Sequence, residues 1–275
     1  MPLVAPPFVP PSEPNKLALL SLIPKSPRAH EVLAHPHNRR LISLIGHDNK
    51  VMQGINIGYQ IATKSRYTLA VIGRRDSDVT IEGGDISTEQ CAFEINKKTQ
   101  LIMLSDRSRY HTTQITGPNA YPFESGRIPR RVILPQLPGS RLDIHGTAGN
   151  LASFDIVWHP VTFNMAEMLE VREDRPDYAL TDDEPETTPV SKRVSRIDRP
   201  INSPVPRLRY IGEGVIGKGG FGQVERILNI DSGNRLVVKK ISYQGQSTDY
   251  LQREVVAMSK IEHVSLNYTN RIYPF

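Results

Sequence analysis

The chain has 275 residues, a formal net charge of +5 and a hydrophobic fraction of 38%, which is enough for two small domains that each bury a core. The single cysteine, Cys91, excludes a disulfide framework and a cysteine-based zinc site. A lone cysteine also favours a reducing, intracellular location in the nucleus or the cytoplasm.

Residues 1–39 are punctuated by prolines, so this segment is predicted to be disordered or extended. The apolar run at residues 17–23 is too short to span a membrane and is interpreted as local packing. An amphipathic turn or a docking peptide are the alternatives. We expect no secretory signal, because no charged region precedes an apolar core at the N-terminus.

Residues 40–160 are predicted to form an antiparallel β-sandwich. Short runs rich in β-branched and aromatic residues alternate there with Gly, Asp, Asn and Pro, and no long helical pattern interrupts them. The predicted strands include residues 67–72, 79–81, 91–95, 101–104, 131–134, 141–144 and 154–158.

Residues 161–207 contain few apolar residues and many charges, prolines, serines and threonines, so they are predicted to be a disordered linker. A short helix over residues 163–171 is the one exception considered. Thr181 and Thr188 are candidate phosphorylation sites, and Ser26-Pro27 fits proline-directed kinases, although such dipeptides also occur by chance. The change from acidic to basic residues near Thr188 is typical of a solvated segment and argues against nucleic-acid binding.

Three motifs within residues 40–160 resemble the forkhead-associated (FHA) family. Gly73-Arg74 ends a predicted strand, residues 87–90 read Ser-Thr-Glu-Gln, and residues 105–112 read Ser-Asp-Arg-Ser-Arg-Tyr-His-Thr. The family pattern is Gly-Arg, then Ser-x-x-His, then Asp-x-x-Ser-x-Asn-Gly-Thr. The resemblance implies a β-sandwich that binds phosphothreonine through its loops.

A phosphothreonine carries a charge of about −1.5 to −2 and needs a fixed guanidinium and small hydroxyl donors. The resemblance assigns Arg74 as the guanidinium and Ser87 as the hydroxyl donor, with Thr88 beside it, and Arg109 as a second guanidinium next to Tyr110. The alternative is a sandwich in which these are ordinary surface residues.

This chain departs from the FHA pattern at two places. Gln90 stands where the family has a histidine that supports the loop, and Gln can still form hydrogen bonds. Tyr110-His111 stands where the family has Asn-Gly, and Tyr110 cannot copy the paired donor and acceptor of asparagine. The peptide specificity is therefore expected to differ.

From residue 208 onward the sequence resembles the first part of a protein kinase domain. Residues 216–224 fit the glycine-rich loop, and residues 235–241 fit the Val-Ala-Ile-Lys strand. Dinucleotide-binding folds share the bare glycine pattern, but their loop leads into a helix, and here a strand is predicted to follow. A helix is predicted over residues 248–261.

The kinase resemblance implies an ATP site on a partial α+β small lobe. Lys239 is assigned as the phosphate-binding lysine and Glu254 as its ion-pair partner, while strand alternation turns Lys240 to the other face. The implied ATP-binding residues are Ile216, Gly217, Lys218, Gly219, Gly220, Phe221, Gly222, Gln223, Val224, Val237, Lys239 and Lys240.

No His-Arg-Asp or Asp-Phe-Gly motif follows Lys239, so the catalytic site is expected to be incomplete and Mg²⁺ to bind only with a large lobe. Val264-Ser265 is what an in-frame intron start would encode, which suggests a truncated gene product. We therefore expect a chain from an FHA-containing serine/threonine kinase, similar to fungal checkpoint kinases of the DNA-damage response.

The expected ligands are ATP and phosphothreonine-containing proteins, with the chain's own phosphorylated linker among the candidates. One alternative is a non-catalytic phosphothreonine-binding adaptor with a vestigial kinase lobe. A third reading is a nucleic-acid adaptor that uses the basic part of the linker, which would show a steep dependence of DNA binding on salt.

Overall fold

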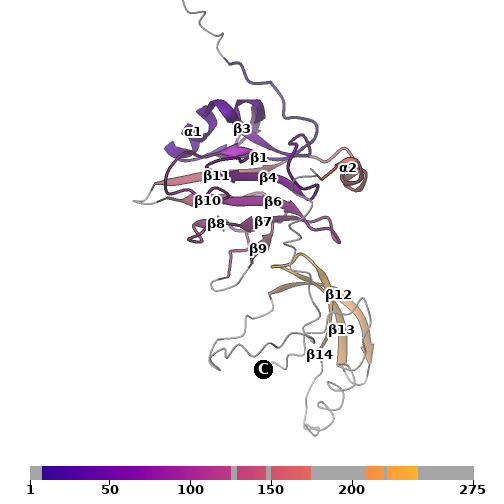
Figure 1. Cartoon of the computed structure of the whole chain (residues 1–275). Helices are drawn as coiled ribbons and strands as arrows, with labels where there is room; N and C mark the ends of the chain where they lie inside the picture. The colour runs from indigo at the N-terminus through magenta and orange to yellow at the C-terminus, as the bar shows by residue number, and fades with distance from the viewer. Residues whose placement is uncertain (1–7, 125–128, 147–149, 175–208, 220–221, 241–275) are drawn as a thin grey trace, which may run out of the picture. The chain divides into compact units, whose positions relative to one another are not determined.

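A computed structural model describes residues 8–124, 129–146, 150–174, 209–219 and 222–240 (Figure 1). The described chain divides into two compact units. Residues 8–174 form the first unit, and residues 209–240, apart from the turn at 231–233, form the second.

The first unit contains two sheets (Figure 1). The six-stranded sheet has the order β2-β3-β1-β11-β10-β8, with β1 at Ala18–Pro24, β2 at Ile42–His47, β3 at Lys50–Gly58, β8 at Thr113–Thr116, β10 at Arg141–His145 and β11 at Leu151–Trp158. The five-stranded sheet has the order β5-β4-β6-β7-β9, with β4 at Thr68–Gly73, β5 at Val79–Thr80, β6 at Cys91–Ile95, β7 at Ile102–Asp106 and β9 at Arg130–Ile133.

The prediction of a mainly β, antiparallel architecture is confirmed, and the two sheets are compatible with a β-sandwich. Among the strands that the structure describes, only the short β4–β5 pair is parallel. Each of the seven predicted strand segments coincides with a strand, and β2, β3 and β8 are additional strands in the same part of the sequence. Both sheets contribute to the core, since Phe93 of β6 and Phe154 of β11 are both almost completely buried.

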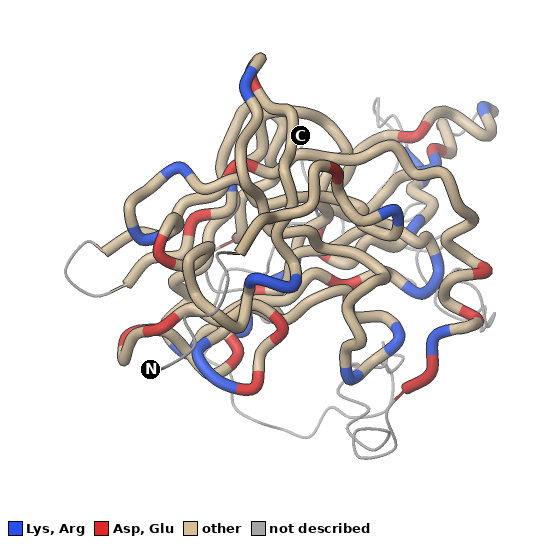
Figure 2. Tube along the Cα trace, turned by 90° about the horizontal axis from the view of Figure 1, so that it is seen from above, with Lys and Arg blue, Asp and Glu red and all other residues tan. Residues whose placement is uncertain are grey.

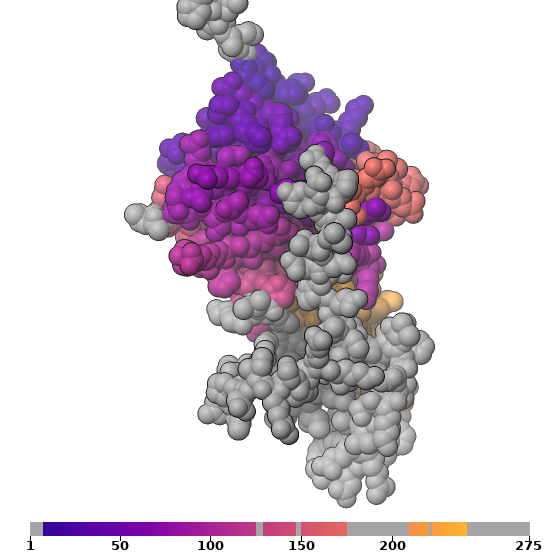
Figure 3. Space-filling model, viewed as in Figure 1, coloured from indigo at the N-terminus to yellow at the C-terminus, as the bar shows by residue number. Residues whose placement is uncertain are grey.

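The prediction that residues 1–39 are disordered is wrong for the described part from Ala18 onward. All seven residues of β1 are buried, and β1 pairs with both β3 and β11 in the interior of the larger sheet. The apolar run read as local packing therefore supplies a central strand. In Figure 3 the indigo N-terminal residues are continuous with the violet residues that follow.

Two short helices continue this N-terminal segment, α1 at Pro27–Ala34 and the 3-10 helix η1 at Pro36–Leu41. The Ser26 hydroxyl caps α1 by accepting a hydrogen bond from the Ala29 backbone N–H at 3.3 Å, and Pro27 occupies the first helical position, where its missing N–H costs nothing. The prolines here begin helices, and the Ser26 hydroxyl considered as a phosphorylation target is engaged as a cap.

The predicted linker also begins later than expected. Helix α2 spans Met165–Val171, within the short helix allowed at 163–171, and Tyr59 packs edge-on against Phe163 at 5.5 Å. Arg172 donates hydrogen bonds to the Ile61 carbonyl at 2.5 Å and to the Thr63 hydroxyl at 2.8 Å. Residues 161–174 therefore pack on the first unit, and residues 175–208, with Thr181 and Thr188, lie outside the described residues.

The second unit is a three-stranded antiparallel sheet in the order β12-β13-β14, at Tyr210–Gly219, Gly222–Asn229 and Arg235–Lys240. The predicted sequence of strand, glycine-rich turn, strand, turn and strand agrees with these elements. Its buried residues include Ile227 and Leu228, whereas Val215, Ile216 and Val237 are each more than half exposed. The predicted helix at 248–261, including Glu254, lies outside the described residues.

Basic and acidic residues are interspersed along the described chain (Figure 2). No helix in the described ranges is long and apolar enough to cross a membrane.

Candidate functional site

Gly73, the last residue of β4, allows the chain to approach the segment before β6 unusually closely. A Cβ atom at this position would lie 1.9 Å from the Thr88 carbonyl oxygen and 2.6 Å from the Ser77 hydroxyl oxygen. No side chain fits in that space. The requirement is steric, since Gly73 is not among the glycines with positive φ.

Arg74 follows at once, and its backbone N–H donates a 3.0 Å hydrogen bond to the Ser87 carbonyl. This contact places the Arg74 backbone beside that of Ser87. Its half-buried guanidinium forms no ion pair or hydrogen bond with any described residue, and its Nε atom is buried without an acceptor. A buried donor left unpaired costs about 1–3 kcal/mol, so an acceptor from a ligand would be favoured here.

The Ser87 hydroxyl joins two loops. Its Oγ atom accepts a hydrogen bond from the Arg109 backbone N–H at 3.1 Å, which leaves the hydroxyl proton available to donate elsewhere. The carbonyl of Thr88, the next residue, accepts a 3.0 Å hydrogen bond from the Ser77 hydroxyl, and the Thr88 side chain is exposed. We call residues 74–78, 82–90 and 107–112 the loop cluster.

Gln90 is completely buried and ties the loop cluster together. Its Oε1 atom accepts a hydrogen bond from the Ser87 backbone N–H at 3.1 Å. Its Nε2 atom donates to the Thr112 hydroxyl at 2.8 Å and to the Thr113 hydroxyl at 3.1 Å. Gln90 thus uses its acceptor and both donors to hold the residue assigned to bind phosphate, as expected of the position where the FHA pattern has histidine.

The loop from 107 to 112 is fixed by the buried Asp106, a role that the sequence did not suggest. The Asp106 carboxylate accepts hydrogen bonds from the Ser108 N–H at 3.0 Å and the Ser108 hydroxyl at 2.6 Å. The Ser108 hydroxyl in turn accepts from the Thr112 N–H at 2.8 Å. Arg130 balances the Asp106 charge with an ion pair of 2.6 Å.

Two arginines of this loop differ in their surroundings. Arg107 forms ion pairs of 2.6 Å with both Glu89 and Glu94. Burial alone would lower the pKa of Arg107, but the two carboxylates outweigh burial and raise it. Arg109 is exposed, and its side chain forms no ion pair with a described residue; its guanidinium carbon lies 5.4 Å from the centre of the Tyr110 ring. Arg109 is therefore the cation of this loop that remains available to an anion.

The backbone N–H groups of Arg74 and Arg109 thus both donate to Ser87, the first to its carbonyl at 3.0 Å and the second to its hydroxyl at 3.1 Å. The two other residues assigned to phosphopeptide binding, Thr88 and Tyr110, lie in the same loop cluster with exposed side chains. In the described residues, no three His, Cys, Asp or Glu side chains gather as a metal site requires.

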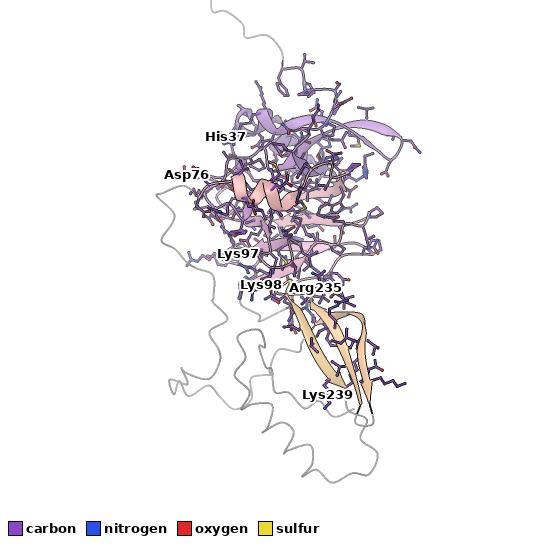
Figure 4. All side chains as sticks on the ribbon, turned by 90° about the vertical axis from the view of Figure 1, so that its right-hand side faces the viewer. His37, Asp76, Lys97, Lys98, Arg235 and Lys239 are labelled. Carbon is purple, nitrogen blue, oxygen red and sulfur yellow. The ribbon has the colours of Figure 1, made fainter. Side chains whose placement is uncertain are left out.

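In the second unit, strand register aligns three of the assigned ATP-binding residues. Gly217 of β12 is opposite Val224 of β13, and Val224 is opposite Lys239 of β14. Directly opposed residues share a face of the sheet, so these three form one row. Figure 4 labels Lys239 near the end of β14.

Lys240 lies in the next row, opposite Gln223 and in line with Lys218, on the other face. Its ammonium group forms an ion pair with Glu225, and that hydrogen bond raises the pKa of Lys240. The inclusion of Lys240 in the ATP-binding set is therefore not supported by its orientation, and Lys239 is the better placed of the two lysines.

The other residues of the ATP-binding set are only partly described. Ile216 is 55% exposed beside Gly217, and Val237 is 53% exposed two residues before Lys239, on the same face. Among the described residues, a Cβ atom on Gly219 would have no neighbour within 4 Å, and Gly222 has a φ of 136°, which favours glycine. Gly220, Phe221 and Glu254 lie outside the described residues.

Comparison with known proteins assigns no family. No protein-family model matches the chain, and no curated protein matches it. The geometry of the loop cluster and of the glycine-rich hairpin is therefore the basis for the function considered next.

Proposed function

We propose that the first unit binds phosphothreonine-containing peptides at the loop cluster. The observation that carries the proposal is Arg74, whose half-buried guanidinium lacks an acceptor among the described residues and whose backbone N–H donates to the Ser87 carbonyl. A phosphate group would supply oxygens to the Arg74 guanidinium and the Ser87 hydroxyl. The three FHA-like motifs favour phosphothreonine as the phosphorylated residue.

The arrangement around these donors also supports a rigid anion site. Gln90 and Asp106 hold the two loops that meet at Ser87, so little ordering remains to be done when a ligand binds. The exposed Arg109 adds a second cation, while Arg107 is neutralised by Glu89 and Glu94. Of these groups, we assign Arg74, Ser87 and Arg109 to the phosphate and its neighbouring residues.

The test compares a phosphothreonine peptide library with its unphosphorylated twin by fluorescence anisotropy, using the whole chain. Arg74→Ala is expected to weaken phosphopeptide binding by about 30-fold, since a hydrogen bond to a charged group contributes about 2 kcal/mol. Arg75→Ala is the matched control, because Arg75 is exposed on the same loop. Equal binding of the two libraries, or an Arg74→Ala variant that binds like the wild type, would refute the proposal.

We propose, as a second function, that the hairpin sheet binds ATP as part of a serine/threonine protein kinase. The supporting observation is the row formed by Gly217, Val224 and Lys239, with the apolar Val237 on the same face. In such a site the glycines allow the backbone to lie close to the phosphates, the valines contact the adenine, and Lys239 holds the phosphates.

Binding of a fluorescent ATP analogue tests this second function. Lys239→Ala is expected to reduce the affinity at least tenfold, by loss of about 1.4 kcal/mol or more. Lys240→Ala is the control and should bind like the wild type, since Lys240 lies on the other face. Equal losses in the two variants would contradict the assignment.

A phosphoryl-transfer assay distinguishes the kinase hypothesis from the hypothesis of a non-catalytic adaptor. Transfer from ATP to a serine or threonine substrate that depends on Lys239 would support a kinase. Phosphothreonine binding that depends on Arg74, without such transfer, would support the non-catalytic adaptor.

A further inference from the structure

Arg28, in the first turn of α1, holds the segment that leads into Ser87. Its two terminal nitrogens donate a paired set of hydrogen bonds to the two carboxylate oxygens of Asp85, at 3.0 and 2.9 Å. The same nitrogens also reach the Glu82 carbonyl at 3.1 Å and the Asn150 carbonyl at 2.9 Å. Only 6% of the Arg28 side chain is exposed, so this ion pair is shielded from solvent.

Two glycines enclose this ion pair. A Cβ atom on Gly83 would lie 2.5 Å from Arg28 Nη2, and one on Gly146 would lie 1.9 Å from Asp85 Oδ2 and 2.3 Å from Arg28 Nη1. The backbone at Gly83 and Gly146 therefore lies too close to the ion pair for a side chain at either position. Asp85 is two residues before Ser87, so this contact fixes one end of the loop that carries the serine hydroxyl.

Asn38 of η1 holds the strand that precedes this loop. Its side chain is fully buried and forms two hydrogen bonds of 2.8 Å with the backbone of Thr80, one to the carbonyl and one from the N–H. Strand β5 is only two residues long and pairs with β4 alone. Asn38 thus takes the place of a neighbouring strand at this edge, and Figure 4 shows His37 of η1 and Asp76 of the loop cluster on the same side.

We infer that Arg28 is a positioning residue for the phosphothreonine site, acting through Asp85 on the geometry of Ser87. The inference rests on the proposed function of the loop cluster. The Arg28 guanidinium is buried against Asp85 and two backbone carbonyls, so its effect on a ligand would come from keeping the segment 82–90 in one conformation. The N-terminal segment, which the sequence suggested to be disordered, would then be required for binding.

The experiment measures phosphothreonine-peptide affinity and amide hydrogen exchange on the same full-length variants. Arg28→Ala is expected to weaken binding about tenfold and to speed exchange of residues 83–90 by a similar factor. Arg28→Lys should give a smaller change of the same kind, because a lysine can hold one acceptor but not the paired set. This milder variant also serves if Arg28→Ala does not fold.

Arg172→Ala is the matched control. Arg172 also holds a loop through backbone carbonyls, but that loop precedes β4, whereas the loop cluster begins where β4 ends. The affinity of the Arg172→Ala variant for the phosphothreonine peptide should stay within about twofold of the wild type, even if its melting temperature is lower. In a double-mutant cycle, Arg28→Ala should add little to Ser87→Ala, since both act on the same hydroxyl.

Equal loss of affinity in Arg28→Ala and Arg172→Ala, or unchanged exchange of residues 83–90 in the Arg28 variants, would overturn the inference. If the wild-type chain shows no preference for the phosphorylated peptide, the proposed function fails separately. The exchange measurement needs no ligand, so faster exchange confined to the Arg28 variants would still support Arg28 as the residue that holds this loop, and unchanged exchange would refute it.

Discussion

The loop cluster at the end of β4 and the glycine-rich hairpin of β12 and β13, the two regions proposed to bind phosphate groups, are built in different ways. In the loop cluster, donors come from side chains whose loops are held by the buried Gln90 and Asp106. In the hairpin, a Cβ atom on Gly219 would meet no described atom within 4 Å.

The glycines of the two motifs differ in whether the fold itself excludes a side chain at their positions. Gly73 is required by the fold itself, because a carbonyl oxygen occupies the place of its side chain. At Gly217 and Gly219 no described atom lies close enough to exclude a side chain, and Gly217 follows an irregularity in strand register at Val215. The glycines of the two motifs are therefore under different steric constraints.

Gly73→Ala should produce the largest effect. The added methyl group clashes with the Thr88 carbonyl, and we expect a loss of about 3 kcal/mol in the free energy of unfolding. Chemical denaturation measures the loss. Cys91 provides a second measurement, because burial of its thiol raises its pKa and keeps it unreactive until the first unit opens.

Gly84→Ala is the control for that variant, since a Cβ atom there would have no neighbour within 4 Å. Its stability and its Cys91 reactivity should match the wild type. If Gly73→Ala were equally neutral, the steric role of Gly73 would be wrong and the comparison with the hairpin would lose its basis.

Gln90→Ala should have the next largest effect. It removes three side-chain hydrogen bonds and leaves the Ser87 N–H without its acceptor, at an expected cost of about 2 kcal/mol in unfolding free energy. Phosphopeptide affinity should fall as well, because Ser87 loses its support. Gln114→Ala, at an exposed position of β8, should change neither quantity. Normal affinity in Gln90→Ala would show that the loop cluster does not depend on this support.

His111→Gly should stabilise the chain slightly. His111 has a φ of 55°, a left-handed conformation that suits glycine, and the FHA pattern has glycine at this place. Relief of backbone strain, reduced by the greater flexibility of unfolded glycine, should leave a gain of about 0.5 kcal/mol. Gln100→Gly, at a φ of 58° in the turn after β6, should show a similar gain in thermal unfolding. A loss at position 111 alone would mean that the contact of His111 with Asp106 outweighs the strain.

Gly217→Ala should have the smallest effect on stability and so sharpens the contrast with Gly73. A Cβ atom at Gly217 would lie 3.8 Å from Val224 Cβ, an ordinary contact, so the unfolding free energy should change by no more than about 0.5 kcal/mol. Affinity for the ATP analogue should nevertheless decrease if the backbone approaches phosphate there. A destabilisation as large as that of Gly73→Ala would remove the distinction between the two motifs.

The sequence predicted seven strands of the first unit from β-branched and aromatic runs bounded by turn residues, as in β6 and β10, but not β2, β3 and β8. It failed at β1 and α1, because clustered prolines suggested disorder. The signal was present, since Ser26-Pro27 is a typical helix start and an apolar run precedes it. What a local pattern could not reveal is that this run pairs with β11, more than a hundred residues away.

The candidate site shows the same limit. Arg74, Ser87 and Gln90 were found because each belongs to a short motif. Arg28, Asp85 and Asn38 belong to none, and they meet only when residues 26–41 fold against residues 80–85. Contacts between distant segments leave no regular spacing in the sequence, so supporting residues of this kind become visible only in three dimensions.

Gly73 and Arg74 are neighbours in the chain, yet selection would conserve Gly73 for the fold and Arg74 for ligand binding. Any descendant that preserves this sandwich must retain Gly73, whatever it binds. Arg74 has a buried nitrogen without an acceptor among the described residues, so the fold gains nothing from its guanidinium and a smaller apolar residue would suit the site better. In a lineage that had abandoned its ligand, position 74 would drift while position 73 stayed fixed.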